Sequence, residues 1–107
     1  MTNMSDLFYN AGTFTQDISS WDTSKVTNMW AMFAQASSFN QPIGLWNTTN
    51  VQYMNGMFDQ AFVFNQDIRS WNVNYAAASW NRQVTNFRSR AALSDANTPP
   101  LILQLGY

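Results

Sequence analysis

The stretch TNMWAMFAQASSFNQPIGLWNTTNV, residues 27–51, decides the fold, because a variant of it stands on each side in the chain. Residues 2–26 and 52–76 align with it without gaps at a shift of 25. Seven positions carry the same residue in all three copies: Met4, Met29 and Met54; Phe8, Phe33 and Phe58; Ala11, Ala36 and Ala61; Phe14, Phe39 and Phe64; Gln16, Gln41 and Gln66; Ile18, Ile43 and Ile68; Trp21, Trp46 and Trp71. Such a period is typical of stacked repeats, in which each unit buries its apolar face against the next one.

The pattern within one repeat predicts a helix and two strands. Met32, Phe33 and Ala36 have the spacing of one face of a helix of about two turns. Alternation over residues 14–20, and the apolar positions in residues 26–29, predict two short strands that pair in parallel between repeats. We therefore expect an α/β repeat solenoid with short parallel strands and one short helix per 25-residue repeat.

The identical positions are expected to form rows of like side chains along the stack. The Gln row shares the parity of core residues, so we expect its amides to satisfy one another as a ladder. The Trp row is expected in the core, and the alternative is an exposed aromatic row that binds sugars or a partner. The predicted structural rows are Phe14, Phe39 and Phe64; Gln16, Gln41 and Gln66; Ile18, Ile43 and Ile68; and Trp21, Trp46 and Trp71.

The chain is expected to divide into a repeat region and a cap. Residues 1–76 hold the three repeats (2–26, 27–51 and 52–76), and residues 77–107 form a divergent C-terminal cap with an apolar tail. No polar cap precedes the first repeat. We therefore expect that a partner covers its N-terminal edge, or that the chain is a piece of a longer protein.

One further repeat start is visible in the cap. Residues 84–87 (VTNF) echo the VTNM of the second repeat, which implies an insertion of eight residues near residues 74–82. Arg88 and Arg90 would then lie on an altered fourth helix, whose polar face covers the end of the stack. The apolar tail, residues 101–107, is expected either to fold back on the core or to insert into a partner.

Composition argues against several classes of function. Five basic and six acidic residues give a net charge of −1, whereas nucleic-acid binders carry a basic patch. The chain has no Cys and no His, which removes disulfides, thiolate nucleophiles and the commonest general base. Its apolar runs are far shorter than the ~20 residues of a membrane helix, so we predict no transmembrane segment, and we also expect no signal peptide.

The acidic residues do not suggest an active site or a metal site. Asp17 and Asp67 share one position two repeats apart, which strand spacing converts to ~10 Å, outside the ~6.5–9.5 Å of inverting glycosidases. Asp22 has Asn at the equivalent position of the other two repeats, which is too little charge for calcium. We therefore predict no catalytic residue, no metal site and no cofactor.

Aromatic residues at positions that vary between repeats are candidates for an interface, since packing does not require them there. Trp30, for example, has Ser5 and Asn55 at the equivalent positions. Scattered exposed aromatics without a role are the alternative. The candidate interface residues, including those of the cap and tail, are Tyr9, Trp30, Tyr53, Phe62, Tyr75, Arg88, Arg90, Leu101, Ile102, Leu103 and Tyr107.

Residues 26–48, VTNMWAMFAQASSFNQPIGLWNT, resemble the repeat of the BspA-type leucine-rich-repeat surface proteins, once called Mycoplasma lipoprotein repeats. The resemblance covers residues 2–76 and, weakly, residues 84–93. It implies a leucine-rich-repeat-like right-handed coil, and surface or scaffold proteins that bind other macromolecules, often as adhesins. Such repeats also occur in marine algae, and the family brings no catalytic residues.

These observations together favour a non-enzymatic module for protein–protein interaction. Two settings fit: a part of a surface adhesin, or a small accessory subunit that stabilises a larger complex, with a membrane-associated algal complex as one form of the second setting. Its partner would be a protein at the N-terminal edge or the C-terminal tail. The alternative is a carbohydrate-binding module that uses exposed aromatics. The expected location is the cell surface or the secreted fraction by resemblance, or the periphery of a membrane complex.

Overall fold

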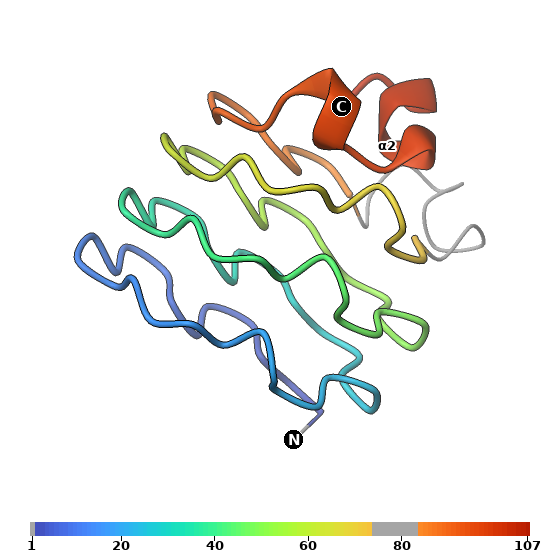
Figure 1. Cartoon of the computed structure of the whole chain (residues 1–107). Helices are drawn as coiled ribbons and strands as arrows, with labels where there is room; N and C mark the ends of the chain where they lie inside the picture. The colour runs from blue at the N-terminus through green and yellow to red at the C-terminus, as the bar shows by residue number, and fades with distance from the viewer. Residues whose placement is uncertain (1, 74–83) are drawn as a thin grey trace.

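Equivalent residues of successive repeats lie side by side in the computed structural model, which describes residues 2–73 and 84–107 (Figure 1). The Phe8 and Phe33 rings stack with centroids 5.5 Å apart, and the Phe33 and Phe58 rings at 5.6 Å. Phe14, Phe39 and Phe64 form a second column, with successive centroids 5.7 and 5.9 Å apart. The two columns contact each other in every repeat, as at Phe33 and Phe39, whose centroids are 4.4 Å apart. They form the centre of the core.

Main-chain hydrogen bonds in the turn segment, residues 4–10 and its equivalents, alternate in direction. One set of N–H groups points to the next repeat and donates at 2.8–2.9 Å: Met4 to Asn28, Asp6 to Trp30, Phe8 to Met32 and Asn10 to Ala34. The intervening N–H groups close turns within the repeat: Leu7 to Met4, Tyr9 to Asp6 and Ala11 to Phe8. Every other amide of the turn segment therefore bonds to the next repeat, and the amides between them bond within their own repeat.

Two residues of each turn segment have a left-handed backbone, which the alternation requires. The first set is Asp6, Ala31, Gly56 and Asn86, and the second is Asn10, Gln35, Gln60 and Arg90, with φ between 54° and 60°. This conformation costs roughly 1–2 kcal/mol at a residue with a Cβ. The packing between repeats outweighs that strain, because seven of these eight residues are not glycine.

The predicted α/β solenoid with parallel strands and one helix per repeat is wrong. The described residues hold only a 3-10 helix, η1 (Asp95–Asn97), and one α-helix, α2 (Pro100–Gln104), both outside the repeats. In place of strands they show two isolated parallel pairings, Asn3 with Asn28 and Asn28 with Tyr53, and no sheet. The apolar spacing that suggested a helix belongs to successive turns, because a helix would need every amide to bond within its own segment.

The result is a compact globule with almost no regular secondary structure. Its radius of gyration is 12.2 Å, close to the about 13 Å expected for a folded domain of this size. Its extents are 34 × 28 × 20 Å. No helix in the described ranges has the length and apolar character to cross a membrane.

Residues 84–93 continue the stack in a register that differs from the predicted one. The N–H of Phe33 donates to the carbonyl of Met57, 24 residues on, whereas the N–H of Phe58 donates to the carbonyl of Phe87, 29 residues on. The step to the continued stack is therefore five residues longer than the step between earlier repeats, and not eight residues longer as predicted. Val84 therefore occupies the place of Met54, and the predicted insertion at residues 74–82 lies outside the described residues.

Arg88 ends the first phenyl column, since the register places it where Phe58 stands in the preceding repeat. Its guanidinium donates to the carbonyl oxygens of Tyr107 and Leu93 at 2.9 and 3.0 Å, and pairs with Asp95 at 2.7 Å. The tail, residues 101–107, folds back on the core, with Ile102 fully buried. A cation bonded to main-chain carbonyls closes the stack where a further phenyl ring would leave an apolar end.

We expect the central ring of the second column to contribute more to stability than its first ring. Phe39→Ala removes a fully buried side chain and should lower the free energy of unfolding by about 3–5 kcal/mol. Phe14→Ala removes the equivalent, half-buried ring and should cost about half as much. Urea unfolding followed by tryptophan fluorescence measures both, and equal losses would contradict in-register stacking as the source of stability.

Gly44 should tolerate no side chain, because a Cβ there would overlap the main-chain carbonyl oxygen of Asp67 in the next repeat. Gly44→Ala should therefore destabilise the protein by about 1–3 kcal/mol. Gly12→Ala is the matched control, since its Cβ would lie 3.4 Å from Ser37 Oγ, an ordinary contact. Thermal unfolding of the two variants should differ clearly, and a Gly44 variant as stable as the control would refute the close approach.

Candidate functional site

Each of the three repeats exposes one aromatic side chain from its turn segment or from the residue just before it. Trp30 in the second repeat is 51% exposed, and Tyr9 and Tyr53 in the first and third are exposed as well. Tyr53 pairs with Asn28, two residues before Trp30, and diagonal neighbours of this kind lie within reach of aromatic side chains. We call Tyr9, Trp30 and Tyr53 the aromatic stripe.

The main chain holds Trp30 in place although the fold does not require its indole. Its N–H donates to Asn28 Oδ1 at 2.9 Å, and its carbonyl accepts from Asp6 at 2.9 Å. These contacts do not involve the side chain, and the equivalent positions carry Ser5 and Asn55. A large exposed aromatic that packing does not explain is a candidate binding residue.

Polar atoms near the stripe have unused hydrogen-bonding capacity. Asn55, which follows Trp30 at the equivalent position of the third repeat, is almost fully buried and donates from Nδ2 to Thr85 Oγ1 at 2.9 Å. Its Oδ1, like one carboxylate oxygen of Asp59, is buried without a hydrogen-bond partner. Buried polar atoms are almost always satisfied, so these two are exceptions, and because they are enclosed they offer no contact to a ligand at the surface.

The structure separates the other candidate interface residues into exposed and engaged groups. Phe62, Arg90 and Leu103 are exposed, and Phe62 lies beside exposed Val63. Ile102 is fully buried, Leu101 and Tyr107 pack half-buried against the core, and Arg88 is bonded as described above. Tyr75 lies outside the described residues. The cap and tail therefore do not present the free apolar segment that insertion into a partner would need.

The predicted Ile row is buried throughout, whereas the Trp row is buried except at its first residue. Ile18, Ile43 and Ile68 are buried, as are Trp46 and Trp71, whose Nε1 atoms donate to the carbonyls of Ile18 and Ile43 at 3.1 and 3.0 Å. Only Trp21, at the open end of the row, is substantially exposed among the three. The Trp row is therefore closed to sugars over most of its length.

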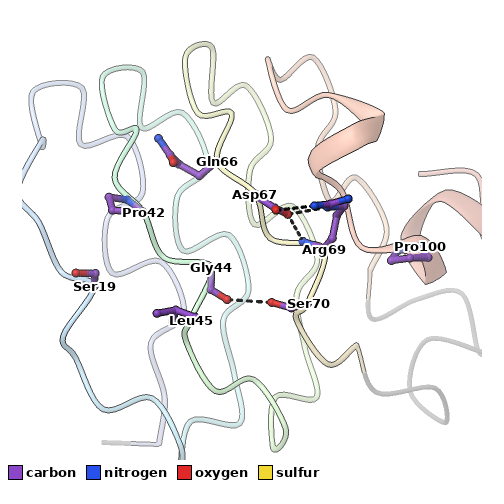
Figure 2. Close-up of a pocket in the computed structure, with 9 residues that line it drawn as sticks. All are labelled: Ser19, Pro42, Gly44, Leu45, Gln66, Asp67, Arg69, Ser70 and Pro100. Atoms are coloured by element: carbon purple, nitrogen blue, oxygen red, sulfur yellow. Dashed lines mark hydrogen bonds and ion pairs between the residues drawn. The ribbon is translucent and has the colours of Figure 1, made fainter.

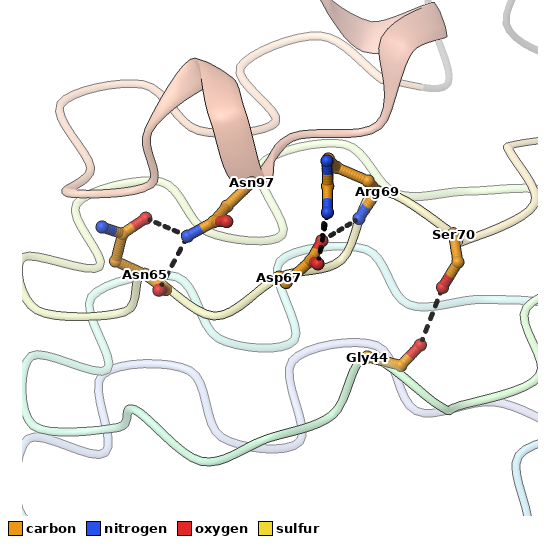
Figure 3. Close-up of polar contacts among 6 residues, drawn as sticks. All are labelled: Gly44, Asn65, Asp67, Arg69, Ser70 and Asn97. Atoms are coloured by element: carbon orange, nitrogen blue, oxygen red, sulfur yellow. Dashed lines mark hydrogen bonds and ion pairs between the residues drawn. The ribbon is translucent and has the colours of Figure 1, made fainter.

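The predicted ladder of Gln amides bonded to one another is wrong. Gln41 donates to the Thr15 carbonyl at 2.8 Å, and Gln66 to the Asn40 carbonyl at 3.0 Å, each in the preceding repeat. Asn97 of η1 bonds the Asn65 carbonyl in the same way, at 3.0 Å (Figure 3). Gln16, in the first repeat, is exposed. The Gln41 and Gln66 side chains therefore bond the main chain of the preceding repeat and not one another, because their amides lie at the surface and not in the core.

A groove of about 760 Å³ is lined by residues from all three repeats (Figure 2). The sequence analysis did not predict it. Its lining comes from the three repeats and the start of α2: Ser19, Pro42, Gly44, Leu45, Gln66, Asp67, Arg69, Ser70 and Pro100. Leu45 is 98% exposed. The signal was present in the sequence, since Leu45 replaces Ser20 and Ser70 at its position.

The carboxylates beside this groove each stabilise a turn. Asp67 accepts from Arg69 Nε and Nη2 at 3.0 and 2.9 Å and from the Arg69 main-chain N–H at 3.0 Å (Figures 2 and 3). These bonds, the side-chain ones first, lower the pKa of Asp67 to about 2. The Ser19 hydroxyl and N–H likewise lower the pKa of Asp17. Such acids stay ionised and act as acceptors, not as proton donors. In the described part of the chain, no three acidic, His or Cys side chains come together.

We expect the Asp67 carboxylate to titrate near pH 2, well below its ordinary 3.8. Because the pKa is lowered on folding, the pair adds its stabilisation above about pH 4, and this is lost as the pH falls through about 2. NMR titration of the carboxyl carbon measures the value. Arg69→Met should return it towards 3.8, and an unchanged midpoint in that variant would show that Arg69 is not the cause.

A comparison with protein families covers most of the chain. The pattern of a family described as "Mycoplasma protein of unknown function, DUF285" matches residues 1–95. No curated protein matches the chain, and no solved structure does. The matched range includes all three repeats and the continued stack up to Asp95, at the start of η1. The chain therefore belongs to this DUF285 family.

Proposed function

We propose that this chain is a non-enzymatic module that binds another protein through its aromatic stripe. The single observation that carries the proposal is Trp30, whose indole is half exposed on a main chain that is held by contacts independent of it. Tryptophan and tyrosine dominate binding energy at protein interfaces, because each buries a large area at a small cost in side-chain entropy. The core already has its own aromatic columns, so packing offers no competing reason for Trp30.

The chemistry of Asp17 and Asp67 gives no support to an acid–base role for these two residues. Asp17 and Asp67 accept hydrogen bonds from residues two positions on in their own repeats, and their pKa values are lowered. A general acid needs a pKa near the working pH, which these bonds oppose. The low charge of the chain, 10% of residues, also suits a surface in which shape and aromatic contact provide the affinity.

We also propose the closer affiliation of the chain with the BspA-type surface proteins. Support comes from residues 26–48, which match that repeat, and from membership in the DUF285 family. This affiliation favours a part of a surface adhesin as the setting. The second setting, an accessory subunit that stabilises a larger complex, is supported by the same exposed stripe, since both require a rigid surface.

Carbohydrate binding is the second candidate function. The observation in its favour is that exposed Trp30 and Tyr53 lie in adjacent repeats. Flat exposed aromatic faces suit the apolar face of a sugar ring. The buried Trp row does not contribute, which limits a glycan to the stripe.

A photo-crosslinking residue at position 30 should give discrete protein adducts in cells that make the chain, whereas the same residue at position 45 should not. Trp30→Ala should then weaken the isolated partner's binding at least about tenfold, the loss typical of a hot spot. Leu45→Ala is the matched control, because it removes an even more exposed apolar side chain from the groove.

Both variants should unfold at the temperature of the unchanged protein, since neither side chain is in the core. Identical adducts from positions 30 and 45 would contradict the proposal. Binding on a glycan array that Trp30→Ala abolishes, without protein adducts, would favour the carbohydrate alternative.

A further inference from the structure

Asn55 and Gly56 form the one Asn-Gly pair in the sequence. An asparagine followed by glycine is prone to deamidation, in which the main-chain nitrogen of the glycine attacks the side-chain carbonyl carbon of the asparagine. Because glycine has no Cβ, nothing hinders that approach. The pair lies in the turn segment of the third repeat, which bonds to the continued stack of residues 84–93.

The packing requires neither residue of this pair. Gly56 has a left-handed φ of 60°, but Ala31 has a φ of 54° at the equivalent position of the second repeat. A Cβ on Gly56 would meet the Cβ of Asp59 at 4.0 Å, an ordinary contact. Asn55 is 6% exposed, and its Oδ1 is buried without a hydrogen-bond partner, which costs stability. Stacking therefore gives no reason for an Asn-Gly pair at this place.

Both reacting groups are held by one residue of the continued stack, Thr85. The Gly56 N–H, which supplies the nucleophile, donates to the Thr85 carbonyl at 2.9 Å. The Asn55 Nδ2, which leaves as ammonia, donates to Thr85 Oγ1 at 2.9 Å. On the other side, the Asn55 carbonyl accepts from the Ala31 N–H at 2.8 Å. The peptide group between Asn55 and Gly56 is therefore fixed between its neighbours, and its N–H is closed to a base in solution.

We propose that Asn55 is a deamidation site, blocked while residues 84–93 are docked and reactive when they leave the third repeat. Once the bonds to Thr85 are broken, the Gly56 N–H loses its proton to water or hydroxide, and the nitrogen attacks Asn55 Cγ. The side-chain amide nitrogen takes up one proton and leaves as ammonia, so that a succinimide ring forms. Water then opens the ring at either carbonyl and gives aspartate or isoaspartate, with no change in oxidation state.

Each product opposes the return of residues 84–93. Aspartate places a charge where Asn55 Oδ1 is enclosed without a hydrogen-bond donor, and a buried charge without a partner is strongly unfavourable. Isoaspartate adds one methylene to the main chain, which moves the Gly56 N–H out of line with the Thr85 carbonyl. Deamidation therefore requires undocking, and its products prevent redocking. This modification is separate from the binding role proposed above.

The rates of deamidation in the full chain and in a synthetic peptide of residues 50–60 test the block. Both are kept in mildly alkaline buffer, and peptide mapping by mass spectrometry follows aspartate and isoaspartate at position 55. The peptide should react at least about tenfold faster, because the full chain must first open locally. Gly56→Ala should slow the reaction in both, since a methyl group hinders ring closure. Equal rates in the peptide and the full chain would contradict the block.

Two destabilised variants separate local undocking from unfolding of the whole chain. Arg88→Ala removes the guanidinium that bonds the cap and tail, and should speed deamidation at Asn55 at least about tenfold. Phe14→Ala weakens the stack in the first repeat and should leave the rate unchanged. Equal acceleration by both variants, or none by Arg88→Ala, would overturn the coupling to residues 84–93.

A milder variant and the purified product complete the test. Thr85→Val removes the acceptor of Asn55 Nδ2 and keeps the shape of the side chain, so deamidation should be faster with the fold retained. The deamidated chain, separated by ion-exchange chromatography, should lose hydrogen-exchange protection at the Phe58 N–H, which bonds the Phe87 carbonyl at 2.8 Å. An unchanged rate in the Thr85 variant, or full protection of that amide after deamidation, would refute the proposal.

Discussion

The structure depends on one constraint: every main-chain amide must find a partner in a chain that forms neither helices nor sheets in its repeats. The turn segments meet it by alternation, with one N–H bonded to the next repeat and the following N–H closing a turn. This arrangement requires two left-handed residues in each repeat. The left-handed turns place equivalent residues of successive repeats side by side, and the phenyl rings stack as a result. This stacking offsets the backbone strain.

The aromatic columns convert that alignment into a core. Rings from successive repeats stack nearly parallel, and each repeat also joins its two columns. The same register places buried hydroxyl groups of one repeat against carbonyls of the next, as Thr23 and Thr48 do at 3.0 and 2.9 Å. Where the register ends, Arg88 replaces the ring and satisfies main-chain carbonyls of the cap and tail.

The proposed binding function uses exposed residues that are not required for the stacking of the repeats. Trp30 is such a residue.

The sequence by itself determined the repeat length and the identities of the core columns, because apolar residues that recur at one spacing must meet when the repeats stack. It also singled out Trp30, from variation within its own column. It could not determine the backbone. Short apolar spacings fit a helical turn and a series of left-handed turns equally well, and a strand alternation does not show whether amides pair across or within a repeat.

Only the tertiary structure decided those points, together with the five-residue shift before Val84, the surface position of the Gln row and the docking of the tail. The physical reason is shared by all of them. Each depends on which hydrogen-bond partner a group finds when several are chemically equivalent, and that choice is made by the packing of whole repeats against each other.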